Sequence, residues 1–261
     1  MTAEDRSALE QLIFSKEFLR TEDPGRKTQD IVFDLRTLKA VFESMKKFDI
    51  DYLDYPIMSG KESIVFKAYS KKKPIVVKIF KMSTLRFSKL YMYVQGDRRF
   101  EHEKKDRSRI VYLWARKEYV NLKTARECHI NVPMPIGLHQ NIIVMQYLGT
   151  KASPAPELRK SNIDMAKAFS QVRDSMRLLY TKAELVHADL SEYNMLIYRG
   201  KVYMIDFGQS VSIEHPSAMI FLERDVKNVC NFFNKKEVKC NVNDLLSGLS
   251  ILLLLQSRFG D

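Results

Sequence analysis

The apolar positions of the first fifty residues recur at the spacing of an amphipathic helix. One stretch carries Leu9, Leu12, Ile13 and Phe18, and a second carries Leu35, Leu38, Val41, Phe42 and Met45. Residues three and four apart lie on one face of a helix, so such a stripe can pack against a core. The pattern predicts a small N-terminal helical region over residues 1–50.

After residue 50 the pattern changes to short runs rich in β-branched residues. Ser63–Tyr69 and Pro74–Phe80 are two such runs, and the basic stretch Ser70–Lys73 separates them. This arrangement predicts two antiparallel strands joined by a turn. A further strand is expected at Asn141–Tyr147, and a linker with glycine and prolines at 149–156 marks the end of a sheet-rich lobe, 51–148.

Helical periodicity returns in most of the remaining chain. It is carried by Tyr112, Ala115, Tyr119, Leu122 and Ala125, and later by Ile163, Ala166, Phe169, Val172, Met176 and Leu179. Further helices are expected at Leu222–Phe233 and Leu245–Phe259, whereas Leu196–Tyr198 and Val202–Ile205 predict a β-hairpin turning at Arg199 and Gly200. The chain is therefore expected to have an α+β fold with a helical second lobe, 149–261.

A basic segment with little apolar periodicity interrupts the sheet-rich lobe at residues 84–109. Its eight cationic residues are Arg86, Lys89, Arg98, Arg99, Lys104, Lys105, Arg107 and Arg109, and its interleaved aromatic residues are Phe87, Tyr91, Tyr93 and Phe100. Cationic side chains bind phosphates, and aromatic rings stack on bases. We expect a flexible, exposed insertion that becomes ordered when it binds RNA or another polyanion.

Composition adds three expectations. With 261 residues, of which 45% are hydrophobic and 29% charged, the chain can bury one or two cores, and its formal charge of +11 favours polyanionic partners. The longest aliphatic run, Ile251–Leu255, is too short to span a bilayer, so a soluble, cytoplasmic protein without membrane contact is expected. Cys128, Cys230 and Cys240 are odd in number and widely spaced, which predicts ordinary thiols in a reducing compartment.

The strongest chemical signal is the segment His187–Asn194, with the sequence HADLSEYN, followed by Ile205–Gly208, with the sequence IDFG. Phosphoryl transfer needs an oxygen acceptor beside the nucleophile and oxygen ligands for magnesium. Asp189 suits the first task, and Asn194 and Asp206 suit the second. The predicted hairpin would bring the two motifs together. Taken singly, each Asp could be a turn residue and Asn194 a cap, but the ordered pair favours catalysis.

A lysine in the middle of a predicted buried strand is the second signal. Lys78 lies in the run IVVKIF, and burial of an ammonium group requires a partner or an anion. Glu118 lies on a predicted helix beside its apolar stripe, so Lys78 could hold nucleotide phosphates while paired with Glu118. The alternatives are a lysine that reaches solvent from an edge strand and an exposed helix glutamate.

The turn at Met58–Ser63 is a weaker signal. It has a single glycine and matches neither of the usual glycine-rich phosphate-binding motifs. Backbone amides around Gly60 and Lys61, with the hydroxyl of Ser59 or Ser63, could approach phosphates. A simple polar hairpin turn is the alternative.

Together these motifs resemble the RIO family of atypical serine/threonine protein kinases, and within it the first RIO subgroup. The similarity covers roughly residues 52–238. It includes the SGKE turn at 59–62, Val77-Lys78, Lys117-Glu118-Tyr119 with Asn121-Leu122, HADLSEYN, IDFGQ and the stretch HPSAMIFLERDVKN at 215–228. The resemblance implies a two-lobed protein-kinase-like fold with a RIO-specific N-terminal helical extension and a reduced helical C-lobe. It also implies a role in maturation of the small ribosomal subunit, with the pre-ribosomal small subunit and ribosomal RNA as partners.

The resemblance also implies a role for each site residue. Lys78 would contact the phosphates of ATP, paired with Glu118; Asp189 would be the catalytic aspartate; Asn194 and Asp206 would bind Mg²⁺, for which Mn²⁺ could substitute. Backbone groups of Gln146 and Leu148 would contact adenine. The family further implies an ATPase cycle in which Asp206 becomes transiently phosphorylated as a 4-aspartylphosphate.

Some features depart from ordinary protein kinases. Ser191 stands where a lysine is common, no APE segment follows Asp206, and only a short interval leads to His215, so the usual peptide-docking platform is missing. Met58 and Ser63 differ from the common family turn. Two alternatives remain: a small-molecule phosphotransferase, against which the family-like stretch at 215–228 argues, and an RNA-binding pseudokinase scaffold, against which the intact catalytic residues argue.

Overall fold

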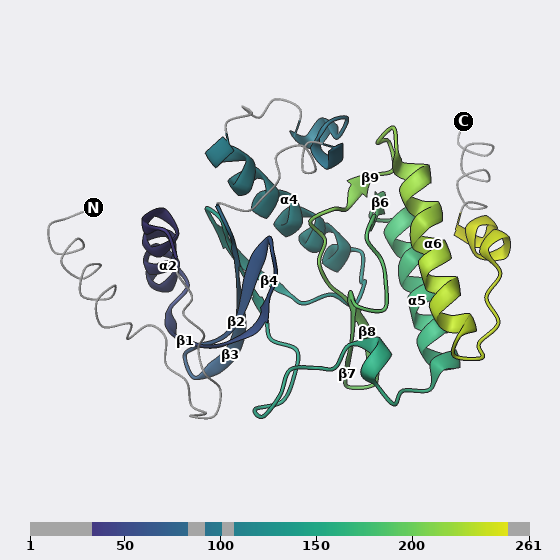
Figure 1. The fold of residues 1–261 in the computed structure, drawn as a ribbon, viewed down its shortest axis with the longest axis horizontal. Helices are drawn as coiled ribbons and strands as arrows, with labels where there is room; N and C mark the ends of the chain where they lie inside the picture. Colours follow the sequence, from purple (N-terminus) through teal and green to yellow (C-terminus); the bar gives the residue numbers. More distant parts are fainter. Residues whose placement is uncertain (1–32, 83–91, 101–106, 250–261) are drawn as a thin grey trace, which may run out of the picture. The chain divides into compact units, whose positions relative to one another are not determined.

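A computed structural model describes residues 33–82, 92–100 and 107–249 of the chain (Figure 1). The helix expected around residues 9–18, the end of the helix expected at 245–259 and parts of the basic segment 84–109 lie outside these residues. The described chain forms two compact units. The first takes residues 33–82, 107–119 and 135–147, and the second takes residues 92–100, 120–134 and 148–249.

The helix α2 (Leu35–Lys47) opens the first unit and confirms the second predicted helix. Asp34 caps it, because its carboxylate accepts hydrogen bonds from the backbone N–H and the hydroxyl of Thr37, both at 2.9 Å. Ala40 and Val41 on its apolar face pack into the core of the unit. The apolar stripe, together with this cap, explains why the segment is helical here.

The first unit is built on an antiparallel five-stranded sheet with the order β1-β2-β3-β5-β4. Its strands are β1 (Ile50–Ser59), β2 (Ser63–Ser70), β3 (Lys73–Phe80), β4 (Pro135–His139) and β5 (Ile142–Gln146). β2, β3 and β5 confirm predicted strands. β1 and β4 were not predicted, because register shifts break the side-chain alternation of β1 and β4 contains a proline and a glycine.

Alternation along β2 and β3 gives the sheet two different faces. Phe66 and Val77 point to the face that α2 covers and lie in the apolar core, together with Leu53 and Val144. The residue after Val77 in the chain, Lys78, therefore points to the opposite face. Strand alternation in this way separates the apolar core from the charged groups of the site.

The second unit is mainly helical. The long helix α4 (Arg107–Glu127) contributes its later turns, and α5 (Met165–Thr181) and α6 (Ala218–Asn234) lie side by side, green and yellow-green in Figure 1, with the rings of Phe169 and Phe233 5.1 Å apart. Short strands complete the unit: β6 (Leu185–Val186) pairs with β9 (Val211–Ser212), and β7 (Met195–Tyr198) pairs with β8 (Lys201–Met204). The hairpin and the helices expected at 112–125, 163–179 and 222–233 are confirmed. None of the helices in the described ranges is long and apolar enough to cross a bilayer.

The described part of the basic segment differs from the expectation of an exposed insertion. Residues 92–100 belong to the second unit and end in a 3₁₀ turn, Arg98–Phe100. Tyr93 and Phe100 are buried, and the Tyr93 ring stacks on Phe221 at 5.3 Å. Because these two aromatic rings are packed inside the protein, they are not available to bases. The prediction that they stack on RNA bases is wrong.

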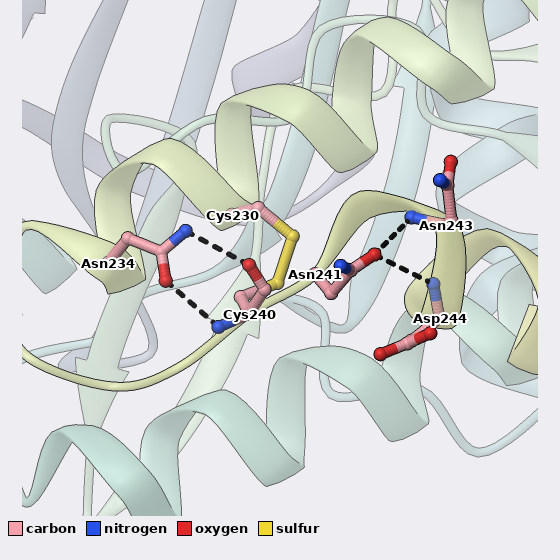
Figure 2. Close-up of a disulfide and its surroundings, with 6 residues drawn as sticks. All are labelled: Cys230, Asn234, Cys240, Asn241, Asn243 and Asp244. Carbon is pink, nitrogen blue, oxygen red and sulfur yellow. Dashed lines mark hydrogen bonds between the residues drawn. A yellow bond between two sulfur atoms is a disulfide. The ribbon is translucent and has the colours of Figure 1, made fainter.

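The prediction of three free thiols is wrong for two cysteines. Cys230 and Cys240 form a disulfide, while Cys128 is a free thiol (Figure 2). The chain turns back after α6 because the side chain of Asn234 donates to the carbonyl of Cys240 and accepts from its N–H, both at 2.9 Å. The pairing depends on this turn, which spacing along the sequence does not reveal. The cysteines therefore give no support to a reducing compartment.

The packing of Phe48, the residue after α2, beside Gly137 of β4 generates a prediction. A Cβ atom added to Gly137 would lie 2.1 Å from Cε1 of Phe48. Gly137→Ala is expected to lower the free energy of unfolding by about 1–3 kcal/mol, because the ring must move out of a packed core. Denaturant unfolding measures this change. Gly248→Ala, at a position with nothing within 4 Å, is the control, and equal unfolding midpoints for the two variants would contradict the prediction.

Candidate functional site

The candidate site residues of the first unit include a buried ion pair. The ammonium group of Lys78, on β3, donates to Oε1 and Oε2 of Glu118, on α4, at 2.7 and 2.8 Å. The two residues are 6% and 2% exposed. Neither alternative from the sequence holds, because Lys78 does not extend to solvent from an edge strand and Glu118 is not on an exposed helix face. Both oxygens of one carboxylate fix the position of the cation.

The turn between β1 and β2 is exposed and closed by its own backbone. The N–H of Gly60 donates to the carbonyl of Ser63 at 2.9 Å, and the ammonium group of Lys81 donates to the carbonyl of Gly60 at 2.7 Å. A Cβ on Gly60 would meet only that Ser63 carbonyl, at 3.7 Å. Internal packing thus does not require a glycine here. The roles expected of Ser59, Lys61 and Ser63 remain predictions. Lys81, the residue after β3, contacts the turn and was not singled out from the sequence.

In the second unit, the backbone before Asp189 has an unusual conformation that α6 holds in place. Ala188 has a φ of 62°, which is costly for a residue with a Cβ. Its N–H donates to Asp225 at 2.7 Å, its carbonyl accepts from Arg224, and the N–H of Leu190 donates to the other oxygen of Asp225 at 2.9 Å. Asp225 was not predicted, because it lies 36 residues from Asp189 in sequence. Burial raises its pKa to about 7, although its two backbone hydrogen bonds act in the opposite direction.

Two amide side chains orient the carboxylate of Asp189. Nδ2 of Asn194 donates to the carbonyl of Asp189 at 2.8 Å and to its Oδ2 at 3.3 Å, and Nε2 of Gln209 donates to the same Oδ2 at 3.1 Å. Asp189 itself is half-buried. The side chains of Asp189 and Asn194, which both belong to HADLSEYN, are therefore in contact. Gln209 was not assigned a role, although its place in IDFGQ was a signal that could have identified it.

The second motif begins where the hairpin closes. The N–H of Ile205 donates to the carbonyl of Asn194 at 3.0 Å, so the backbones of the two motifs meet at the base of β7 and β8. Asp206 follows with an exposed carboxylate and a φ of 66°. Positive φ in a residue other than glycine often occurs at functional positions.

The donor set of this loop fits magnesium. The amide nitrogen of Asn194 is used in hydrogen bonds to Asp189, so its amide oxygen is the atom left to bind a cation. Asp206 adds a carboxylate. Magnesium is usually bound by one or two such oxygen groups together with the phosphates of a substrate. Within the described ranges, no three His, Cys, Asp or Glu side chains gather in a way that could hold a metal by themselves.

His187 supports the loop as a neutral ring. Its Nε2 lies 3.1 Å from the carbonyl of Ile205, its ring packs on Phe207 at 4.8 Å, and burial lowers its pKa to about 4. A neutral imidazole donates one hydrogen bond through Nε2–H, which matches the carbonyl acceptor. The His187 side chain thus connects the first motif to the backbone and the Phe207 ring of the second, and its ring is not charged near neutral pH.

The two positions expected to meet adenine lie at the end of β5 and just beyond it. Gln146 pairs with Ile75 in the sheet of the first unit. Leu148 belongs to the second unit, is buried, and its carbonyl accepts a hydrogen bond from Ala155 at 2.9 Å. The adenine contacts of Gln146 and Leu148 remain predictions.

Comparison with known proteins gives a consistent result. A model of the RIO domain matches residues 64–245. The chain is 51% identical over 176 residues to the RIO-type serine/threonine-protein kinase Rio1 of Thermoplasma acidophilum, which covers 67% of this chain and 93% of that protein. It is 41% identical over 237 residues to Rio1 of Methanocaldococcus jannaschii, which covers 89% of this chain and 81% of that protein.

Solved structures agree on the fold. The Rio2 kinase of Chaetomium thermophilum, in a complex described as ADP/Mg²⁺-phosphoaspartate, superposes with a TM-score of 0.64 at 20% identity, covering 94% of this chain and 86% of that one. A second structure of that kinase gives a TM-score of 0.66. The predicted α+β, protein-kinase-like fold is confirmed.

The buried ion pair generates a stability prediction. Lys78→Met is expected to lower the free energy of unfolding by about 3–5 kcal/mol, because it leaves the Glu118 carboxylate buried without its cation. The double variant Lys78→Met/Glu118→Leu should recover most of this loss, since no charge remains buried. Denaturant unfolding of the single and double variants measures both effects. Lys123→Met, at the exposed pair with Glu127, is the matched control; a double variant as unstable as the single one would contradict the prediction.

Asp225 generates a pH prediction. Its native pKa of about 7 lies above its ordinary value of 3.8, so between these values the folded protein binds more protons than the unfolded chain. Stability from Asp225 should therefore fall as pH rises from about 4 to 7, by about 4 kcal/mol in total, and level off above that. The quantity to measure is the free energy of unfolding of the wild type minus that of Asp225→Asn at each pH.

The difference measurement matters because His187 acts in the opposite direction. Its native pKa of about 4 lies below its ordinary 6.5, so its contribution is lost as pH falls through this window. Subtracting the Asp225→Asn curve removes the histidine contribution common to both proteins. Asp244→Asn, at an exposed carboxylate, is the control. A difference that is flat between pH 4 and 7 would contradict the assignment to Asp225.

Proposed function

Because this chain belongs to the RIO family of serine/threonine protein kinases, we propose that it binds ATP with Mg²⁺ and transfers the γ-phosphate through Asp189, Asn194 and Asp206. The observation that carries the proposal is the environment of Asp189. Its carboxylate is half-buried and is held by Asn194 and Gln209 at 3.3 and 3.1 Å. An oriented carboxylate beside oxygen ligands for magnesium is what phosphoryl transfer requires.

Nucleotide binding would use groups of the first unit. Lys78, fixed by Glu118, offers a cation of defined position to the phosphates, and backbone groups of the exposed turn around Gly60 would approach them. Asn194 and Asp206 would hold Mg²⁺, with Mn²⁺ as a substitute. The bound ion neutralises charge on the phosphates.

Chemistry would begin when Asp189 accepts the proton of an attacking hydroxyl group or water. The attacking oxygen bonds to the γ-phosphorus, the bond from that phosphorus to the β–γ bridging oxygen breaks, and ADP leaves with the electron pair. Because no peptide-docking segment follows Asp206 in the sequence, hydrolysis or internal transfer is favoured over transfer to a peptide.

Internal transfer to Asp206 is the finer part of the proposal. An Asp206 oxygen would attack the γ-phosphorus, ADP would leave, and water would then release phosphate from the acyl phosphate. Support comes from the exposed carboxylate of Asp206, and from the Rio2 kinase of the same fold whose structure is described as a phosphoaspartate complex. In-line approach of the carboxylate is the geometric requirement.

We further propose that the chain acts in the cytoplasm on pre-ribosomal small subunits and their RNA. The motivation is the family resemblance and the net charge of +11. Arg98, whose side chain is 83% exposed, is a cation of residues 92–100 that could reach phosphate. Base stacking by Tyr93 and Phe100 is not part of this proposal, because both rings are buried.

Rapid-quench labelling with γ-labelled ATP tests the proposal. The wild type should form a labelled acyl phosphate that hydroxylamine releases and that maps to Asp206. Asp206→Asn should carry no such label. Asp189→Ala should stay folded and bind Mg²⁺–ATP in a thermal-shift assay but lose turnover by about 100-fold or more, because its carboxylate acts on the nucleophile.

Each other outcome has a definite meaning. Label found only on serine or threonine counts against the aspartyl intermediate and for an ordinary kinase reaction. Label transferred only to added small alcohols indicates a small-molecule phosphotransferase. A folded wild type that binds RNA but neither hydrolyses ATP nor becomes labelled is a pseudokinase scaffold, and the proposed activity fails.

A further inference from the structure

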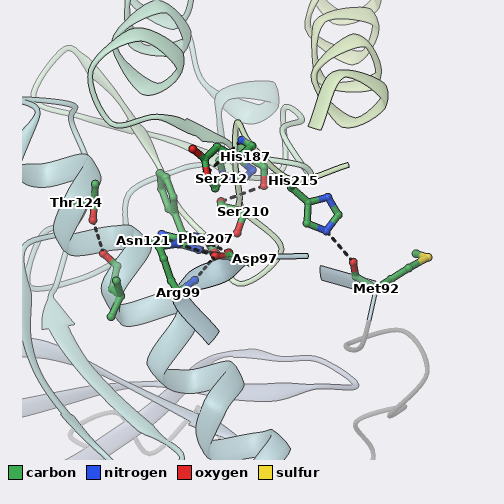
Figure 3. Close-up of polar contacts among 12 residues, drawn as sticks. Met92, Asp97, Arg99, Asn121, Thr124, His187, Phe207, Ser210, Ser212 and His215 are labelled. Carbon is green, nitrogen blue, oxygen red and sulfur yellow. Dashed lines mark hydrogen bonds and ion pairs between the residues drawn. The ribbon is translucent and has the colours of Figure 1, made fainter. Parts of the chain in front are cut away.

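One buried side chain closes the loop that follows Asp206. Nδ2 of Asn121, on α4, donates to the carbonyls of Phe207 and Ser210 at 3.0 and 2.9 Å (Figure 3). These carbonyls flank Gly208 and Gln209, and Asn121 is fully buried. Both protons of the amide are thus used on one short loop, where water does not compete for the acceptors.

The orientation of the Asn121 amide is set from its other end. Its Oδ1 accepts from a terminal nitrogen of Arg99 at 2.9 Å. Arg99 is in turn held by a two-point contact to Asp97, with Nε to Oδ1 at 2.8 Å and the other terminal nitrogen to Oδ2 at 2.6 Å. A guanidinium donor can face only the amide oxygen, so the nitrogen must face the loop. Figure 3 shows this chain of contacts within the second unit.

The loop that Asn121 closes carries a contact to the catalytic carboxylate. Gln209 lies between the two carbonyls, and its Nε2 donates to Oδ2 of Asp189 at 3.1 Å. A second hydrogen bond supports the same loop, from the hydroxyl of Ser210 to the carbonyl of His187 at 3.0 Å. A change in the loop would therefore change how Asp189 is oriented. It would also move the backbone that follows Asp206.

We propose that Asn121, oriented by Arg99 and Asp97, is a positioning residue for phosphoryl transfer, and that it acts through the 207–210 loop and Gln209 on Asp189. This inference rests on the proposed function. Asn121 does not touch the reacting atoms. Its role is to keep the loop in one conformation, because small displacements of a catalytic group reduce the rate strongly.

Asn121→Asp is the main test. It keeps the size of the side chain and an oxygen that can accept from Arg99, but it removes both donors to the loop. The expected result is a 10- to 100-fold lower kcat for ATP turnover, with the KM for ATP changed less than about threefold because the Lys78–Glu118 pair is intact. Asn121→Leu, of similar size and apolar, is the second variant should the buried carboxylate prevent folding. Asn243→Asp, at an exposed asparagine, is the matched control.

A structural measurement on the free protein complements the kinetics. Amide hydrogen exchange of a peptide covering residues 205–212 should be about tenfold faster in either Asn121 variant, as expected for the loss of one or two hydrogen bonds, while α5 stays unchanged. Gln209→Leu should lower kcat without changing this exchange. A folded Asn121 variant with wild-type kcat and wild-type exchange overturns the proposal.

Other outcomes separate this inference from the proposed function. Faster exchange with an unchanged kcat means that Asn121 only stabilises the loop, and the positioning role is wrong. A kcat that falls only in proportion to the folded fraction has the same meaning. If the wild type itself does not turn over ATP, the proposed function fails. The exchange measurement then still tests the role of Asn121 in holding the loop, and unchanged exchange in the variants would overturn that role.

Discussion

The buried carboxylate of Asp225 is the interaction on which the catalytic part of the second unit depends. It accepts the N–H groups of Ala188 and Leu190, while its neighbour Arg224 binds the Ala188 carbonyl and Asn228 donates to the carbonyl of Leu190 at 3.2 Å. One helix, α6, thus holds the backbone on both sides of Asp189. The left-handed conformation of Ala188 persists because these bonds compensate for its steric cost.

The polar groups of this unit form a connected set. Asp225 fixes the backbone around Asp189, Asn194 and Gln209 orient its carboxylate, and Asn121 closes the loop that carries Gln209. Almost all of these groups are buried or half-buried, where an unmade hydrogen bond is expensive. The same low-dielectric surroundings that raise the pKa of Asp225 also keep His187 neutral. The hydrogen bonds among these polar groups therefore keep the backbone around Asp189 rigid.

In the first unit, strand alternation separates the apolar core from a buried ion pair. Along β3, Val77 points into the apolar core and Lys78 points to the other face, where it pairs with Glu118. The charge of each residue is compensated by the other, so the cation can be buried without losing its proton. The residues of the Gly60 turn are exposed, and the ammonium group of Lys81 holds the carbonyl of Gly60. A cation of fixed position on the sheet is suited to an anionic ligand.

The sequence by itself determined the fold class, three of the five strands of the main sheet, the main helices of the described residues, and the residue types that carry the chemistry. These features are local: β-branched runs, helical stripes, and the motifs around Lys78, Asp189 and Asp206 appear within a few residues. Only the tertiary structure decided which distant residues support the catalytic motifs, since Asp225 and Asn121 contact groups 35 to 89 residues away. It also decided that Cys230 meets Cys240 and that Tyr93 and Phe100 are buried. Burial and pairing depend on contacts between segments that are far apart in the sequence. The spacing of residues along the chain does not specify those contacts directly.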